Sequence, residues 1–125
     1  FMRILSPLAI ERFPNAIINV HPAILPAFPG AHAVPEALDH GVTLTGVTVH
    51  FVDEQVDHGP IIAQEPVPVL EGDDEASLHA RIQAVEHRLL PEVVAAYGRG
   101  EMSVQGRHVH WPNRYRNDHE REVTT

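Results

Sequence analysis

The chain has 125 residues, 43% of them hydrophobic and 21% charged, which is enough for one globular domain with a moderate core. Its formal net charge is −8 and its nine Lys and Arg residues are dispersed, which argues against a nucleic-acid partner. It has no cysteine, and no run approaches the roughly 20 apolar residues of a membrane helix. Disulfides, thiol chemistry and a membrane partner are therefore not expected, nor is a signal peptide.

The first part of the chain predicts short strands separated by loops. Residues 1–5 favour a strand, and residues 8–13 allow one or two helical turns. Residues 16–21 form an apolar run between turn signals, typical of a strand buried on both faces in a parallel sheet. A loop that contains Pro22, Pro26 and Pro29 follows, called the proline-rich loop below. A short helix comes next, with Pro35 in its first turn and Gly41 at its end.

Two further strands are predicted in the middle of the chain. Residues 43–52 are rich in β-branched side chains, which favours a strand with its apolar residues on alternate positions. Residues 61–69 also favour extended structure. However, Pro66 and Pro68 lack the amide hydrogen that an interior strand needs, so we expect an edge strand and the end of the sheet.

The apolar positions of residues 75–97 recur at spacings of three and four, which predicts an amphipathic helix. Asp73 or Asp74 is suited to cap its start, and Gly98 or Gly100 to end it.

The last part of the chain predicts a hairpin and a tail. The stretch "MSVQGRHVHW" is typical of a small hairpin that turns at Gln105 and Gly106. We assign residues 1–112 to one domain. Residues 113–125 form a charged tail that has little to bury and is expected to be disordered.

Asn19 and His21 are the first candidates for chemistry, because they interrupt an apolar strand at its carboxyl end. Side chains two positions apart on a strand point the same way, so the amide and the imidazole converge. An amide can donate to a developing oxyanion, and an imidazole can donate a proton or carry charge near neutral pH. The alternative is structural: Asn19 caps the loop and His21 hydrogen-bonds a backbone carbonyl. The residues alone leave both possibilities open.

A loop rich in carboxylates follows the strand at residues 43–52. It contains Asp53, Glu54 and Asp57 and closes at Gly59. A carboxylate beside His21 would orient the imidazole and favour its protonated form. Solvated loop carboxylates are the common alternative, and the sequence does not show which of them meets His21.

Other kinds of site are poorly supported by the sequence. The ten histidines match no common metal-ligand framework, and there is no HExxH motif, so no metal is expected. No serine lies in a nucleophile elbow. Glu86, on the long predicted helix, could bind a substrate at the sheet edge, although the pattern by itself favours a solvated helix charge.

Three stretches resemble the glycinamide ribonucleotide formyltransferase family, the folate-dependent transferases of purine synthesis. They are "NVHPAILPAFPGAHA", "TGVTVHFVDEQVDHGPII" and "QAVEHRLLP", in the family's order. The Asn-x-His-Pro-x-x-Leu-Pro element is shared with the wider formyltransferase group, whereas Phe28-Pro29-Gly30 with His32 points to this member. The resemblance extends from Phe1 to about Gly100. It implies an α/β Rossmann-like fold with a mixed, mostly parallel sheet flanked by helices, and a cytoplasmic enzyme.

The resemblance also implies roles for particular residues. Asn19, His21 and Asp57 would be catalytic in the transfer of a formyl group from 10-formyltetrahydrofolate to the amine of glycinamide ribonucleotide. Asn19 and His21 would stabilise the oxyanion, and Asp57 would hold His21 and assist proton transfer. Glu86 would bind the ribonucleotide. The folate site would comprise Arg3, Ile4, Leu5, His50, Val52, Asp53, Glu54 and Asp57.

The chain departs from the family in one respect, since it has no counterpart of the Gly-rich loop that holds the substrate phosphate. We therefore expect it to be the carboxyl-terminal part of such an enzyme. Apolar strand edges would then favour self-association, for example as a homodimer. The two alternatives are a formyltetrahydrofolate hydrolase and a non-catalytic folate-binding fragment.

Overall fold

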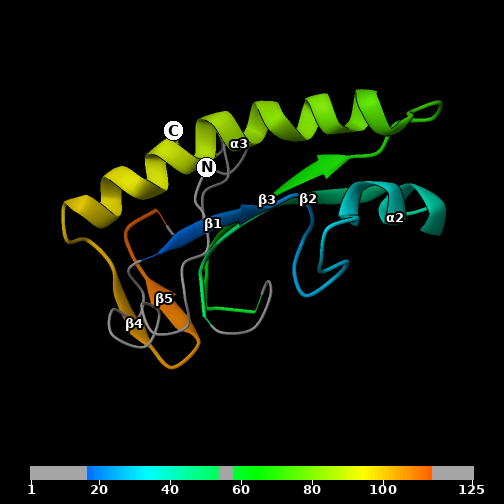
Figure 1. The fold of residues 1–125 in the computed structure, drawn as a ribbon. Helices are drawn as coiled ribbons and strands as arrows, with labels where there is room; N and C mark the ends of the chain where they lie inside the picture. The colour runs from blue at the N-terminus through cyan, green and yellow to red at the C-terminus, as the bar shows by residue number, and fades with distance from the viewer. Residues whose placement is uncertain (1–16, 54–57, 114–125) are drawn as a thin grey trace, which may run out of the picture.

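A five-stranded sheet with the order β1-β2-β3-β5-β4 forms the framework of the protein, and one long helix crosses a face of it (Figure 1). The computed structural model describes residues 17–53 and 58–113. Helix α2 lies near the end of the sheet where α3 begins, and the β4–β5 hairpin lies near the other end (Figure 1). The elements are β1 Ile18–His21, α2 Ala33–His40, β2 Leu44–Phe51, β3 Ile61–Pro68, α3 Glu75–Gly98, β4 Ser103–Gln105 and β5 His108–His110.

The sheet is mixed, as predicted, but its described strands are not mostly parallel. β1 pairs antiparallel with β2, β2 with β3 and β4 with β5, and only β3 and β5 run parallel. The expectation that residues 16–21 join a parallel sheet is therefore wrong for the described pairing. Connection length explains only the β2–β3 pair: a parallel pair needs a crossover of a dozen or more residues, and residues 52–60 are too few. Residues 22–43 between β1 and β2 would be long enough, so the length of that connection does not set their direction.

The prediction that the sheet ends at β3 is also wrong, because β5 and β4 continue it. β5 pairs with β3 at Ile61, at the opposite end of β3 from Pro66 and Pro68. The prolines thus occupy the part of β3 that lies beyond this pairing. Their missing amide hydrogens constrain that part of the strand and leave the Ile61 end free to pair.

The core lies between α3 and one face of the sheet. Val47, Val49 and Phe51 alternate toward this face of β2 and are fully buried. They belong to the same hydrophobic cluster as the buried side of α3, which includes Ile82 and Val93. At roughly 25 cal/mol per Å² of apolar surface, each such side chain contributes about 1.5–3 kcal/mol when it is buried. This apolar periodicity is what holds α3 on the sheet.

The helix boundaries follow from local chemistry. Asp74, one of the two predicted caps, accepts from the Ser77 amide in a capping box at the start of α3. Gly98 is the last residue of α3, and Gly100 follows with φ +74°. Gly41 ends α2 in the left-handed conformation, as predicted.

The predicted hairpin is present, but its turn lies at Gly106 and Arg107, one residue later than expected. The other predictions for the ends of the chain fall outside the described residues. These are the strand at residues 1–5, the helical turns at residues 8–13 and nearly all of the tail at residues 113–125.

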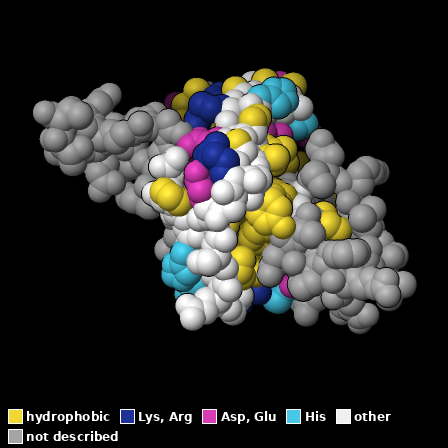
Figure 2. Space-filling model, turned by 90° about the vertical axis from the view of Figure 1, so that its left-hand side faces the viewer, with side chains coloured by type: hydrophobic (Ala, Val, Ile, Leu, Met, Phe, Trp, Pro, Cys, Tyr) yellow, Lys and Arg dark blue, Asp and Glu magenta, His cyan; other side chains and the backbone are white. Residues whose placement is uncertain are grey.

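Some apolar surface remains exposed. Figure 2 shows hydrophobic side chains gathered in a strip over one face of the molecule, with histidines above and below it. The large exposed hydrophobic side chains are Leu44, Leu70, Val94 and Tyr97.

No helix among the described residues combines the length and the apolar character needed to cross a bilayer.

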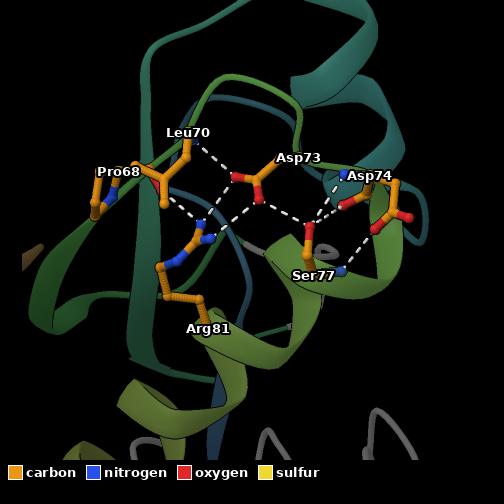
Figure 3. A network of polar contacts seen from close by, with 6 residues as sticks. All are labelled: Pro68, Leu70, Asp73, Asp74, Ser77 and Arg81. Atoms are coloured by element: carbon orange, nitrogen blue, oxygen red, sulfur yellow. Dashed lines mark hydrogen bonds and ion pairs between the residues drawn. The ribbon is translucent and has the colours of Figure 1, made fainter.

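A polar network joins the end of β3 to the start of α3 (Figure 3). The Arg81 guanidinium binds both carboxylate oxygens of Asp73, at 2.9 and 3.0 Å, and also donates to the carbonyl of Pro68. Asp73 accepts further hydrogen bonds from the Leu70 amide and the Ser77 hydroxyl. The Arg81 hydrogen bonds, followed by those from Leu70 and Ser77, hold the pKa of Asp73 well below its usual range.

We expect Asp73→Asn to lower the midpoint of thermal unfolding at pH 7. Because folding depresses the pKa of Asp73, its stabilisation is fully present above the unfolded value of about 3.9 and is lost progressively as the pH falls from there toward the lower folded pKa. The difference between the variant and the wild type should therefore shrink between pH 7 and pH 3. Melting curves across this range measure it. Glu71→Gln, which removes an exposed carboxylate from the same loop, is the matched control and should show no such convergence.

Candidate active site

The side chains of Asn19 and His21 lie on the same face of the sheet. In the antiparallel pairing of β1 with β2, Asn19 is opposite His50 and His21 is opposite Thr48. Directly opposed residues share a face, so the expected convergence of the amide and the imidazole is confirmed, and His50 lies beside them. His21 is buried and Asn19 is half-buried. This face is the one turned away from the apolar core beneath α3.

The imidazole of His21 is held by the loop that follows β1. Its Nε2 atom lies 2.8 Å from the carbonyl oxygen of Phe28. Because a carbonyl oxygen can only accept, Nε2 must donate, and in the neutral ring Nδ1 is the nitrogen without a proton. The structural alternative for His21, a hydrogen bond to a backbone carbonyl, is therefore correct. This bond fixes the orientation of the ring.

Two side chains that the sequence pattern does not mark as functional, Thr48 and Gln64, fix this loop to the sheet. The Thr48 hydroxyl donates to the Ala23 carbonyl at 2.7 Å and accepts from the Leu25 amide at 3.1 Å. Gln64 of β3 donates to the Leu25 carbonyl at 2.9 Å and to the Thr48 hydroxyl at 3.1 Å. The sequence pattern marks Thr48 only as a strand residue, since nothing in the sequence pairs it with a loop residue 25 positions away.

The second loop of the site starts where β2 ends. The Asp53 carboxylate accepts from Nδ1 of His58 at 2.9 Å, which joins the two described ends of this loop. Arg107 of the hairpin turn donates to the carbonyls of His58 and Gly59. Val52 is buried and its amide donates to the Ile17 carbonyl at 2.9 Å.

The remaining predicted site residues lie outside the described part of the structure. These are Asp57, assigned to catalysis, and the folate-site residues Arg3, Ile4, Leu5 and Glu54.

Glu86 lines a pocket of about 280 Å³ on the other side of β1. The pocket lies between Val20 and the α3 residues Glu86, His87, Leu90 and Pro91. Burial raises the pKa of the Glu86 carboxyl, while the nearby histidines, including His21, act in the opposite direction. A partly desolvated carboxylate in a concave, largely apolar pocket is suited to accept hydrogen bonds from ligand hydroxyl groups.

Within the described ranges, no three His, Asp or Glu side chains lie close enough together to hold a metal ion. The groups that share the sheet face of β1 and β2 are an amide and two imidazoles. This set can donate hydrogen bonds to an oxygen that becomes negative and can relay a proton.

The fold and this site define a class of protein: the chain belongs to the formyl transferase family, which its residues 1–94 match. It is similar to the phosphoribosylglycinamide formyltransferase of Mycobacterium tuberculosis, with 56% identity over 107 residues that cover 86% of this chain and 50% of that protein. The crystal structure of glycinamide ribonucleotide transformylase 1 from Symbiobacterium toebii is also similar. It has a TM-score of 0.83 at 49% identity and covers 89% of this chain and 52% of that one.

The likeness extends to a second activity within the family. A formyltetrahydrofolate deformylase from Pseudomonas syringae has a TM-score of 0.82 at 32% identity, and the match covers 89% of this chain and 37% of that one. The Rossmann-like formyltransferase fold expected from the sequence is thus confirmed. The chain spans about half the length of the curated relatives it matches.

Gly59→Ala should destabilise the protein by about 1–3 kcal/mol or more, the range for overpacking a filled site. A Cβ atom at Gly59 would lie 1.8 Å from the carbonyl oxygen of Phe51, and neither backbone segment can move away cheaply. Gly98→Ala is the control, because a Cβ there meets nothing within 4 Å. It should be neutral or stabilise by up to about 1 kcal/mol. Denaturant unfolding of both variants measures the contrast, and equal effects would contradict it.

Glu86→Gln should raise the unfolding midpoint at pH 7. Because folding raises the pKa of this carboxyl, the ionised side chain opposes folding above its folded pKa, and the penalty disappears as the pH falls below the unfolded value of about 4.3. The stabilisation should therefore vanish near pH 4, as thermal melts at the two pH values would show. Glu92→Gln, on the same helix, provides the comparison. A variant less stable than the wild type at pH 7 would contradict the expectation.

Proposed function

We propose that this chain supplies the catalytic and folate-binding part of a phosphoribosylglycinamide formyltransferase. The reaction is transfer of the formyl group from 10-formyltetrahydrofolate to the amine of glycinamide ribonucleotide. The observation that carries the proposal is the convergence of Asn19 and His21 on one sheet face, within a chain 56% identical to an enzyme of that name. The proposed location is the cytoplasm.

The proposed step is direct attack on the formyl carbon. The amine nitrogen of the ribonucleotide adds to this carbon, and the formyl oxygen takes up the negative charge of a tetrahedral intermediate. The bond from the carbon to N10 of the folate then breaks, the amine loses a proton and N10 gains one. The chain needs to supply donors for the oxyanion and a path for one proton, and neither requires a covalent enzyme intermediate.

Asn19 and His21 are the proposed oxyanion partners. The Asn19 amide group carries two N–H donors, and its half-buried position lets it face a bound substrate. Nε2 of His21 donates to the Phe28 carbonyl, and in this proposal Nδ1 is the atom that faces the reacting groups. Nδ1 can donate only when the ring is protonated, and the proposed role of Asp57 is to favour that form and to assist the proton transfer.

The proposed substrate contacts flank this centre. His50, Val52 and Asp53, with the loop that continues to Asp57, would bind the folate together with Arg3, Ile4, Leu5 and Glu54. Glu86 would bind the ribonucleotide. Its pocket between β1 and α3 supports this role, because burial there raises the pKa of the Glu86 carboxyl.

Two other functions remain as candidates. The similarity to a deformylase supports a hydrolase that passes the formyl group to water, although the "FPGAHA" loop favours the transferase. The third is a folate-binding module without turnover, because the chain spans half the length of its relatives.

The first experiment follows the absorbance change as 10-formyltetrahydrofolate becomes tetrahydrofolate, with and without glycinamide ribonucleotide. Conversion that requires the ribonucleotide identifies the transferase, and conversion without it identifies the hydrolase. Binding of a folate analogue without conversion in either case identifies the non-catalytic module.

We expect Asn19→Ala and His21→Ala each to lower turnover by about 100-fold, the scale seen when an oxyanion donor is removed. The same absorbance assay measures this under saturating substrates. Asn113→Ala, which changes an exposed amide far along the chain, is the matched control and should retain full turnover. Near-normal turnover of both site variants would disprove the assigned roles.

A further inference from the structure

Hydrogen bonds from β2 and β3 hold the proline-rich loop, which starts at His21 and folds back so that its Phe28 carbonyl binds the His21 ring. His21 is the last residue of β1, and the chain leaves it toward Ala23 and Leu25. Both of these residues are tied to Thr48, which is the residue directly opposite His21 on β2. The loop then returns, and the Phe28 carbonyl accepts from the imidazole of His21.

The Thr48 hydroxyl makes most of these hydrogen bonds. It has one hydrogen to donate and two lone pairs, and the described contacts use all three: it donates to Ala23 and accepts from Leu25 and Gln64. The side chain of Thr48 is fully buried. A buried hydroxyl with complete hydrogen bonding fixes its partners in one arrangement, since any shift of the loop would leave a buried polar group unpaired.

Gln64 completes the arrangement from the third strand. Its amide nitrogen donates to both the Leu25 carbonyl and the Thr48 hydroxyl. Leu25, buried in the loop, therefore has its N–H held by Thr48 and its C=O held by Gln64. Further along the loop, the ring of Phe28 contacts that of His40 edge to face, with 5.8 Å between centroids. The loop is thus held at Leu25 by hydrogen bonds and at Phe28 by a ring contact.

We propose that Thr48 and Gln64 are positioning residues for His21. They hold the proline-rich loop so that the Phe28 carbonyl keeps the proton of the neutral ring on Nε2 and directs Nδ1 toward the site. Their contribution to formyl transfer rests on the proposed function, whereas their effect on the imidazole does not. Neither residue touches the reacting atoms in this proposal.

The test is the tautomer of His21 in the 125-residue chain. With ¹⁵N-labelled histidine at about pH 8.5, where an ordinary imidazole is neutral, two-bond ¹H–¹⁵N spectra distinguish the protonated from the unprotonated ring nitrogen. The signals of His21 are identified by their loss in His21→Gln. We expect the wild type to carry its proton on Nε2.

Thr48→Val keeps the shape of the side chain and removes the hydroxyl. We expect the two His21 nitrogen signals to move toward each other as the single tautomer is lost. Amide exchange at Leu25 should accelerate about ten-fold, the change that corresponds to one net hydrogen bond. Thr48→Ser, which retains the hydroxyl, should restore both readouts.

Thr45→Val is the matched control. Thr45 is also a buried threonine of β2, but alternation along the strand turns its side chain to the opposite face. This variant should leave the His21 signals unchanged. If it alters them as much as Thr48→Val does, the effect is general loosening and the proposal is wrong.

Gln64→Met keeps the proposal testable if Thr48→Val does not fold, because Gln64 lies at the surface of the sheet. It should shift the His21 signals in the same direction. Unchanged signals in a folded Gln64→Met or Thr48→Val chain would overturn the proposal.

Turnover separates this inference from the proposed function. A tautomer change in a chain that never converts formyltetrahydrofolate supports the positioning role and contradicts the transferase. Lower turnover in Thr48→Val with an unchanged tautomer contradicts the positioning role and leaves the transferase intact.

Discussion

The register of β1 against β2 is the constraint on which the rest of the site depends. Because side chains alternate along a strand, a shift of one residue would exchange the two faces of β1. Asn19 and His21 would then enter the apolar core beneath α3, and Ile18 and Val20 would face the loop. The antiparallel pairs from Ile18 and Phe51 to His21 and Thr48 fix this register. Burial of the valines on the other face of β2 makes any slip costly.

The two faces of the sheet have different tasks. The face beneath α3 contains the apolar residues of β2 and provides stability through burial. The opposite face contains Thr48, His50 and the polar residues of β1, and it is closed by a loop that hydrogen bonds hold in place. Hydrogen bonds and the burial of Ala23 and Leu25 together hold this loop, so it can present a backbone carbonyl in a fixed position. The carbonyl of Phe28 is presented in this way.

Similarity within the formyl transferase family does not by itself separate transfer to an amine from transfer to water. A transformylase and a deformylase align with this chain at nearly the same TM-score, 0.83 and 0.82. The two reactions differ in the nucleophile that attacks the formyl carbon, which is an amine in one and water in the other. Under the proposed function, the pocket beside Glu86 is where the amine substrate would bind.

The sequence by itself determined the local elements and the paired polar residues of β1. Apolar periodicity predicted α3, β-branched alternation predicted β2, and Gly41 marked the end of α2, because each signal lies within one segment. The helix pattern by itself favours a solvated charge at Glu86, and only the family resemblance suggests that Glu86 binds the ribonucleotide. Only the tertiary structure decided the antiparallel pairing, the continuation of the sheet past β3, and the contacts of Thr48 and Gln64 with the loop. The contacts of Thr48 and Gln64 join residues 16 to 39 positions apart, and the β3–β5 pair joins Ile61 to His108; local patterns do not encode which distant segments meet.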